Sequence, residues 1–168
     1  PADLVKDLPG DNEAKAETID NNLQHEIVKK MSSNPVYYGK LSEMLKKIIM
    51  QRKVAAMSYQ EYLKQVVEMA EAILHPEDNG DYPDEVKNSA ARRALFDYFE
   101  EDLELTVDVD GAIRIAIRPA WKKNRQKQQK IRLAIYEKLL LHSYSKDKAE
   151  EETNQVFDIA QRQEEYDA

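Results

Sequence analysis

The chain of 168 residues carries 25 basic and 32 acidic side chains, a net charge of −7, and no cysteine. The hydrophobic share of 42% and the charged share of 34% predict a soluble, folded, helix-rich protein and exclude a disordered chain. Without cysteine there is no disulfide or thiolate metal site, and no apolar run is long enough to cross a membrane. The acidic balance excludes diffuse binding to nucleic acid, so any such contact must be local.

The first half of the chain predicts an entry linker followed by three helices. Residues 1–11 contain two prolines and one glycine, and Asp11 or Asn12 can cap the first helix. Asn34 followed by Pro35 combines a cap with a proline in the first turn, which indicates the start of the second helix.

A capping box marks the third helix. Ser58 can accept a hydrogen bond from the backbone of Glu61, whose side chain can reach back toward Ser58. The second and third helices both carry apolar stripes and are joined by a short connection, so we expect an antiparallel helical hairpin.

The segment HPEDNGDYP at 75–83 is rich in turn residues and predicts the main loop of the chain. Around it we expect one helical domain at 12–145. The loop would divide this domain into two sub-bundles, at about 12–75 and 84–145.

The segment LELTVDVDGAIRIAI at 103–117 supports two interpretations. Apolar residues alternate on both sides of the turn dipeptide Asp110-Gly111, and this pattern alone favours a short β-hairpin at 105–117. Every fourth residue from Leu105 is also apolar, which is the spacing of a helix.

Two further helices are predicted toward the end of the chain. The first runs from Trp121 to His142, with an apolar side opposite a basic one. The second begins near Lys146, so that 146–168 forms a C-terminal helix with a frayed acidic tail. The whole pattern predicts an all-α bundle of six or seven helices.

A wholly basic segment, IRPAWKKNRQKQQKIR at 117–132, contrasts with the acidic rest of the chain. It holds seven of the 25 basic residues, no acid, and the only tryptophan. As a helix it could follow phosphates, with stacking by Arg or Trp. The more common alternative is a solvated helix whose basic side pairs with acids elsewhere. The candidate residues for contact with DNA or a partner are Arg118, Trp121, Lys122, Lys123, Arg125, Lys127, Lys130 and Arg132.

No catalytic, cofactor or metal motif is present in the sequence. The three histidines lie in different segments, none with a second ligand at the spacing of a helical zinc site. Four glycines leave no phosphate-binding loop, and no serine stands in a nucleophile elbow. We therefore expect no catalytic residue, cofactor or metal in this chain. An enzyme site that only folding assembles, in a deep pocket, stays open as an alternative.

Five motifs follow one another over roughly residues 14–145. They are AETIDNNLQHEI (16–27), NPVYYGKLSEMLKKIIMQRK (34–53), SYQEYLKQVVEMA (58–70), RRALFDYF (92–99) and WKKNRQKQQKIRLAIYEKL (121–139). In this order they resemble the C-terminal helical region of the R (restriction and motor) subunit of type I restriction–modification enzymes. In that family the stretch matching 105–118 looks helical, whereas this sequence departs with Gly111 there and Pro119 after it.

The resemblance implies a non-catalytic fragment of an ATP-dependent type I site-specific deoxyribonuclease. The resembled full-length subunit also carries a nuclease and ATPase motor lobes, which use ATP and Mg and have no counterpart in these residues. The helical region would dock the DNA-translocating subunit onto the methyltransferase core, in a bacterial or archaeal cytoplasm and away from membranes. Its partners would be the methyltransferase (modification) and specificity subunits and the motor lobes of its own subunit. A backbone contact with double-stranded DNA is left open, as is a stand-alone nucleic-acid-binding module that uses the basic helix 118–132.

Overall fold

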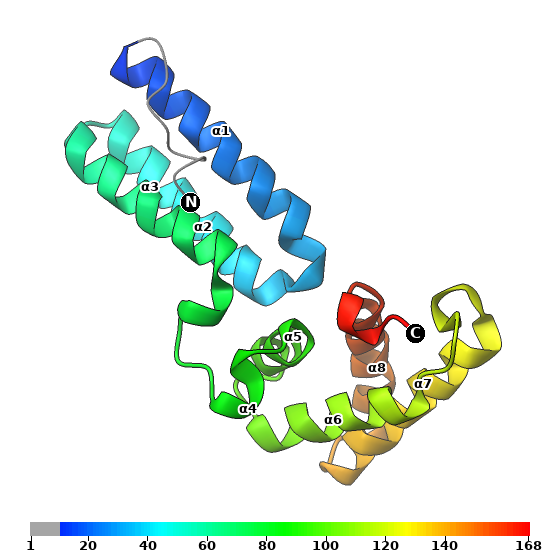
Figure 1. The fold of residues 1–168 in the computed structure, drawn as a ribbon. Coiled ribbons are helices and arrows are strands. Elements are labelled where there is room, and N and C mark those ends of the chain that lie inside the picture. The colour runs from blue at the N-terminus through cyan, green and yellow to red at the C-terminus, as the bar shows by residue number, and fades with distance from the viewer. Residues whose placement is uncertain (1–10) are drawn as a thin grey trace. The chain divides into compact units, whose positions relative to one another are not determined.

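The computed structural model describes residues 11–168, which form eight α-helices and no β-strand (Figure 1). The predicted all-α fold is therefore confirmed. The chain divides into two compact units, Pro1–Asp81 and Tyr82–Ala168. Within 11–168 no helix combines the length and the apolar character needed to cross a membrane. The entry linker predicted at 1–11 lies, except for Asp11, outside the described residues.

The first unit is a bundle of three helices, α1 (Asn12–Lys30), α2 (Pro35–Lys53) and α3 (Tyr59–Leu74). Each helix begins where a side chain caps it. Asp11, Asn34 and Ser58 accept hydrogen bonds from the backbone N–H three residues on, at 2.7, 3.1 and 3.1 Å. These caps confirm the predicted helix starts. The starts could be predicted because a cap depends only on residues close in the sequence.

A buried ion pair ties the three helices of the first unit together. Arg52 of α2 contacts Asp20 of α1 at 2.5 Å and Glu13 at 2.6 Å, and its side chain is only 6% exposed. Tyr62 of α3 donates its hydroxyl proton to Asp20. Burial and this hydrogen bond raise the pKa of Tyr62. Asp20 is thus held by both neighbouring helices.

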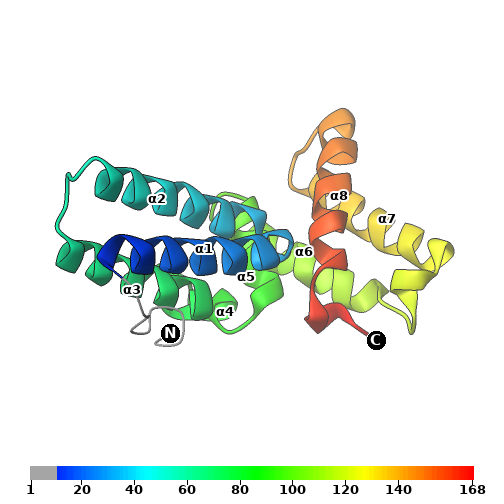
Figure 2. The same cartoon turned by 90° about the horizontal axis from the view of Figure 1, so that it is seen from above.

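The second unit contains five helices around one core. They are α4 (Asp84–Lys87), α5 (Ala90–Tyr98), α6 (Leu103–Ala116), α7 (Arg125–Leu141) and α8 (Lys146–Gln161). Helix α7 packs against both α6 and α8 (Figure 2). The short α4 is a single turn, so seven longer helices and this turn make up the described fold.

The β-hairpin that alternation favoured at 105–117 is wrong, because this segment is helix α6 over most of its length. Asp102 caps the helix by accepting from the backbone N–H of Leu105 at 3.0 Å. Leu105, Val109 and Ile113, four residues apart, are all buried on one side. The four-residue spacing describes the segment, and the alternation does not.

The helix predicted from Trp121 begins four residues later. Ala120 has a left-handed conformation with φ of 59°, and the short 3₁₀ turn Trp121–Lys123 follows it. Asn124 is extended, with φ of −127°, and caps α7 by accepting from the backbone N–H of Lys127 at 3.0 Å. The chain therefore changes direction just before α7, and the basic segment is split between a turn and a helix.

The C-terminal end is packed, so the fraying predicted for the acidic tail is wrong. After α8 the chain forms a 3₁₀ turn, Glu164–Tyr166, and Tyr166 is 1% exposed. Its backbone carbonyl accepts from Trp121 Nε1 at 2.7 Å, and its hydroxyl donates to Asp110 at 2.6 Å. Helix α8 and the residues after it thus belong to the second unit.

Asp110 is the buried acceptor that holds this end of the chain. Its carboxylate accepts from Arg92 at 2.8 Å and from Arg114 at 3.0 Å, besides Tyr166. Burial acts to raise the pKa of Asp110, but the hydrogen bonds from Arg114, Tyr166 and Arg92 outweigh it and lower the pKa. Asp110 therefore stays ionised and joins α5, α6 and the C-terminal turn.

Candidate interaction surface on α7 and α8

Trp121, a predicted contact residue, lies in the core of the second unit. Its side chain is 1% exposed, and its ring centroid lies 6.0 Å from that of Phe157 in a T-shaped arrangement. With its indole N–H bonded to Tyr166, it cannot stack on a base or touch a partner. The prediction of a contact role is wrong for this residue.

Arg118 and Lys127 hold the turn that leads into α7. Arg118 Nη1 donates to the carbonyl oxygens of Ile115 and Ile117, each at 2.8 Å. Lys127 Nζ donates to the carbonyl oxygen of Pro119 at 2.5 Å. Neither cation has an acidic partner among residues 11–168, so both positive charges remain uncompensated.

Lys122 and Arg132 are partly engaged by the end of the chain and by α8. Lys122 forms an ion pair with Asp167. Arg132 Nη1 donates to Asn154 at 2.7 Å, and its guanidinium lies 4.0 Å from the ring centroid of Phe157. The amide of Asn154 is neutral, so Arg132 keeps its net charge at the surface.

The side chains of Lys123, Arg125 and Lys130 are exposed and make no hydrogen bond or ion pair with any residue of the described range. The alternative in which the basic side pairs with acids elsewhere in the chain therefore applies, within residues 11–168, to Lys122 alone. The surface keeps most of the positive charge that the sequence gives it.

A shallow depression of about 670 Å³ gathers part of this charge. Every side chain that lines it is either a cation or an amide, without an acid or an apolar residue. The lining residues are Lys122, Lys123, Arg125, Gln128, Gln129, Arg132 and Asn154. The structure thus adds three amides that the sequence did not single out, and we call this site the basic depression.

The start of α7 adds to the positive potential of the basic depression. A helix carries a partial positive charge at its N-terminus, which favours acidic residues there. Helices α6 and α8 follow this preference with Glu104 and Asp147 in their first turns. The first turn of α7 has no acid and instead holds Arg125 and Lys127. The backbone and the side chains therefore repel one another at this helix start.

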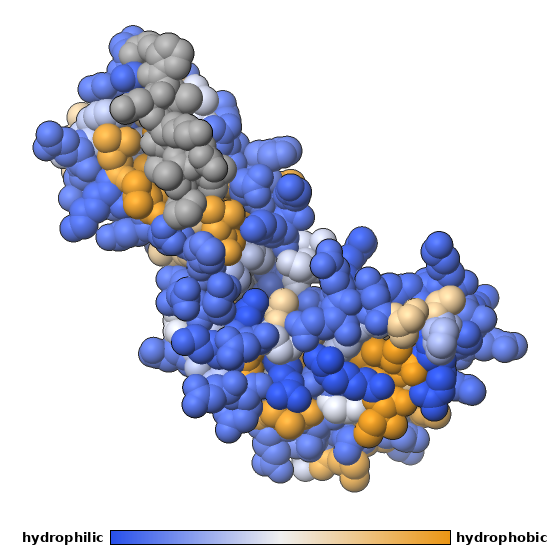
Figure 3. Space-filling view, viewed as in Figure 1, coloured by the Kyte–Doolittle hydropathy of each residue, from blue (hydrophilic) through white to orange (hydrophobic). Residues whose placement is uncertain are grey.

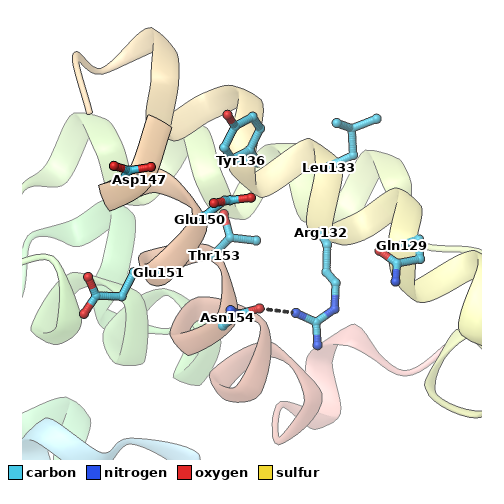
Figure 4. Close-up of a pocket in the computed structure, with 9 residues that line it drawn as sticks. All are labelled: Gln129, Arg132, Leu133, Tyr136, Asp147, Glu150, Glu151, Thr153 and Asn154. Atoms are coloured by element: carbon cyan, nitrogen blue, oxygen red, sulfur yellow. Dashed lines mark hydrogen bonds between the residues drawn. The ribbon is translucent and has the colours of Figure 1, made fainter. Parts of the chain in front are cut away.

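A wider groove of about 770 Å³ runs between α7 and α8 next to the basic depression (Figure 4). We call it the α7–α8 groove. The two sites share Gln129, Arg132 and Asn154, so they form one continuous surface. The groove is lined by Gln129, Arg132, Leu133, Tyr136, Asp147, Glu150, Glu151, Thr153 and Asn154.

The α7–α8 groove combines apolar, acidic and unsatisfied polar groups. Leu133 is 55% exposed, and Tyr136 beside it is half-buried. Figure 4 shows Thr153 on α8 below Tyr136. The Thr153 side chain is buried, and its hydroxyl has no hydrogen-bond partner within residues 11–168. A buried hydroxyl without a partner carries a desolvation cost within the folded second unit.

The face drawn in Figure 3 is mostly hydrophilic, with hydrophobic residues gathered in small patches. In the second unit, the large apolar side chains that remain exposed are Ile115, Leu133 and Leu141. Of these, only Leu133 lines the α7–α8 groove. Leu141, at the end of the same helix, is a natural reference for it.

The histidines do not form a helical metal site in the described residues. The potential ligand atoms of His75, Glu77 and Asp78 lie within 4.8 Å of one another in the turn after α3. Helical spacing in the sequence does not reveal this cluster, because its residues lie in and directly before the 3₁₀ turn Pro76–Asp78. His142 contacts Asp108 at 2.7 Å. Exposed acids of this kind are common without a metal, and the cluster has no further feature that indicates an ion.

Comparisons of the chain with known protein families, with curated proteins and with solved structures give no match. The resemblance to type I R subunits therefore depends on the five sequence motifs alone.

Proposed function

We propose that this chain is a non-catalytic helical domain of the R subunit of a type I restriction–modification enzyme. Its role is to dock the ATP-dependent, DNA-translocating and nuclease subunit onto the methyltransferase core. Five motifs in the order of that family support the assignment, and so does an all-helical fold over residues 11–168.

The α7–α8 groove is the observation that carries the docking role. Protein interfaces combine apolar and aromatic anchors with a polar rim, and Leu133 and Tyr136 beside acidic residues fit that description.

Two of the carboxyl groups with lowered pKa values, those of Asp110 and Glu152, support a structural role. Asp110 binds Arg92, Arg114 and Tyr166. Glu152 is held by Tyr98 and Lys148, whose hydrogen bonds outweigh burial and lower its pKa. Such groups mark active sites when they line a cleft, but these two line neither the groove nor the basic depression.

Gel filtration tests the docking role. The full chain is mixed with the purified methyltransferase and specificity subunits, without DNA, and we expect co-elution. Leu133→Asp places a charge in the apolar part of the α7–α8 groove and is expected to abolish co-elution. The matched control Leu141→Asp changes a more exposed leucine of α7 outside the groove, 75% against 55% exposed, and it is expected to co-elute. Separate elution of the unaltered chain at micromolar concentration contradicts the proposal, and so do variants that behave alike.

A second candidate is a stand-alone nucleic-acid-binding module that uses the segment 118–132. The uncompensated charges of Lys123, Arg125 and Lys130 favour it. This candidate predicts binding to nucleic acid without any subunit of a restriction enzyme.

A further inference from the structure

We propose that the basic depression binds the phosphate groups of a DNA duplex, independently of base sequence. This inference deepens the docking role and rests on it for its biological setting, since the docked domain would then touch the DNA that its complex holds. The contact itself stands on the chemistry of the depression.

The charge of the basic depression is available to a ligand. Lys123 and Arg125 are exposed and have no partner within residues 11–168, and Arg132 is bonded only to a neutral amide. Cations that already pair with acids would gain little from a phosphate, because the ligand would only replace one anion by another. Lys122 is the exception in the depression, because it pairs with Asp167. At Lys123 and Arg125 a phosphate meets charges that no acid of residues 11–168 neutralises, and it releases the counterions that surround the duplex.

The amides of the depression complete a phosphate site. Gln128, Gln129 and Asn154 line it among the cations. Proteins contact phosphate oxygens with Arg and Lys and also with Asn and Gln side chains, which donate neutral hydrogen bonds. Gln128 Nε2 donates to the carbonyl oxygen of Lys122 at 2.9 Å, so the turn before α7 holds this amide in place.

The start of α7 reinforces the preference for an anion. Arg125 and Lys127 stand in its first turn, where the helix itself is positive. An anion bound beside them would relieve a repulsion that the free protein carries. The helix start thus supplies a second source of positive potential at the same place as the exposed cations.

A duplex fits the basic depression better than a single strand or an acidic protein. Single-strand binders stack bases on aromatic side chains, but no aromatic residue lines the depression, and Trp121 is buried beneath the surface. Protein interfaces need apolar anchors at their centre, and the depression has none. Cations and amides alone are the chemistry of a contact with the sugar–phosphate backbone.

Fluorescence anisotropy tests the inference with the full chain and a labelled duplex of roughly three helical turns. Titrations start at low salt, because sequence-independent binding is weak, with Kd of about 10⁻⁴ to 10⁻⁶ M at physiological salt. We expect log K to fall linearly with log salt, with a slope near −3 for about three phosphate contacts. Two duplexes of unrelated sequence are expected to bind equally.

The decisive variant is Lys123→Glu with Arg125→Glu, which reverses two exposed charges without touching the core. We expect a loss of affinity of about tenfold or more and a salt slope nearer zero by about 2. The matched control is Lys40→Glu with Lys47→Glu, two exposed lysines on α2, which changes the net charge by the same amount. Circular dichroism checks that both variants keep their helices.

Three outcomes overturn the inference: no binding of the unaltered chain at low salt, equal losses in the two double variants, or tighter binding to an acidic polypeptide than to the duplex. The docking test contains no DNA, so the two proposals fail separately. Co-elution with the methyltransferase complex without duplex binding removes this inference and leaves the docking role in place.

Discussion

Asp110 is a buried carboxylate that stabilises the second unit, and its contribution to the free energy of unfolding depends on pH. It is fully buried and accepts from Arg92, Arg114 and Tyr166. Its lowered pKa means that the folded protein binds a proton less readily than the unfolded chain does. The stabilising contribution is thus complete above the usual carboxyl pKa of about 3.9 and is lost as the pH falls through the lower folded value.

We predict that Asp110→Asn lowers the free energy of unfolding of the second unit by about 3 kcal/mol at neutral pH. This value is at the low end for a broken buried ion pair, because the side chains of Arg92 and Arg114 are 32% and 39% exposed, respectively. Urea unfolding between pH 7 and pH 3 checks it. The difference between the variant and the unaltered chain is expected to shrink below about pH 4. A difference that stays constant with pH would contradict the role given to Asp110, and Asp158→Asn, an exposed aspartate of α8, serves as the control.

Thr153 is a residue whose replacement is expected to stabilise the second unit, in contrast to that of Asp110. Its hydroxyl is buried without a partner in the described part of the chain, so replacing it by a methyl group removes a desolvation cost. We expect Thr153→Val to stabilise the second unit by about 1 kcal/mol, measured by urea unfolding. A destabilised variant would show that the hydroxyl already has a partner in the free protein.

Helix α6 illustrates at the element scale what the sequence could and could not decide. Leu105, Val109 and Ile113 are four residues apart, and a spacing of four also satisfies the two-residue period of a strand. Periodicity therefore cannot separate the two structures here. The segment forms a helix and not a hairpin because all three side chains then enter one core, together with residues from α7 and α8 that are distant in sequence.

Gly111 is a place where this helix can be strengthened. A Cβ atom built on Gly111 meets no atom within 4 Å. We predict that Gly111→Ala raises the free energy of unfolding of the second unit by about 0.5–1 kcal/mol, because alanine loses less conformational freedom in a helix. Gly39→Ala in α2 is an equally open position and is expected to stabilise the first unit by a similar amount. Destabilisation at Gly111 would contradict a regular helix there.

The helix starts could be predicted from the sequence, and the burial of Trp121 could not. Asp11, Asn34 and Ser58 each cap a backbone group three residues away, which is local chemistry. Trp121 instead bonds to Tyr166, 45 residues further along the chain. The candidate site follows the same division, because the basic segment is visible in the sequence, whereas its continuation onto α8 through Asn154 depends on tertiary packing.

At the scale of the whole molecule, each unit has a core made only of its own residues. One buried cluster extends from Ala16 to Ile73 and the other from Ala91 to Tyr166. A core that includes no residue of the other unit is expected to unfold without it. The two units should therefore behave as separate cooperative transitions.

Tyr166→Ala tests this separation. We expect it to remove about 3–5 kcal/mol from the second unit, as for other large buried aromatic side chains. Trp121 is the only tryptophan, so its fluorescence reports the second unit, while circular dichroism reports both. In urea, the fluorescence transition should move to lower concentration, and the remaining dichroism transition should stay in place. A shift of the entire dichroism curve would mean that the two units unfold as one.

The cations at the start of α7 also affect how the free domain responds to its solvent. Arg125 and Lys127 repel a helix end that is itself positive, and dissolved ions screen this repulsion. Raising the salt concentration from low values is therefore expected to increase the melting temperature of the second unit, followed through Trp121 fluorescence. Lys123→Glu with Arg125→Glu should flatten this increase. The same positive charges that favour an anion would in this way make the second unit more stable at high salt than at low salt.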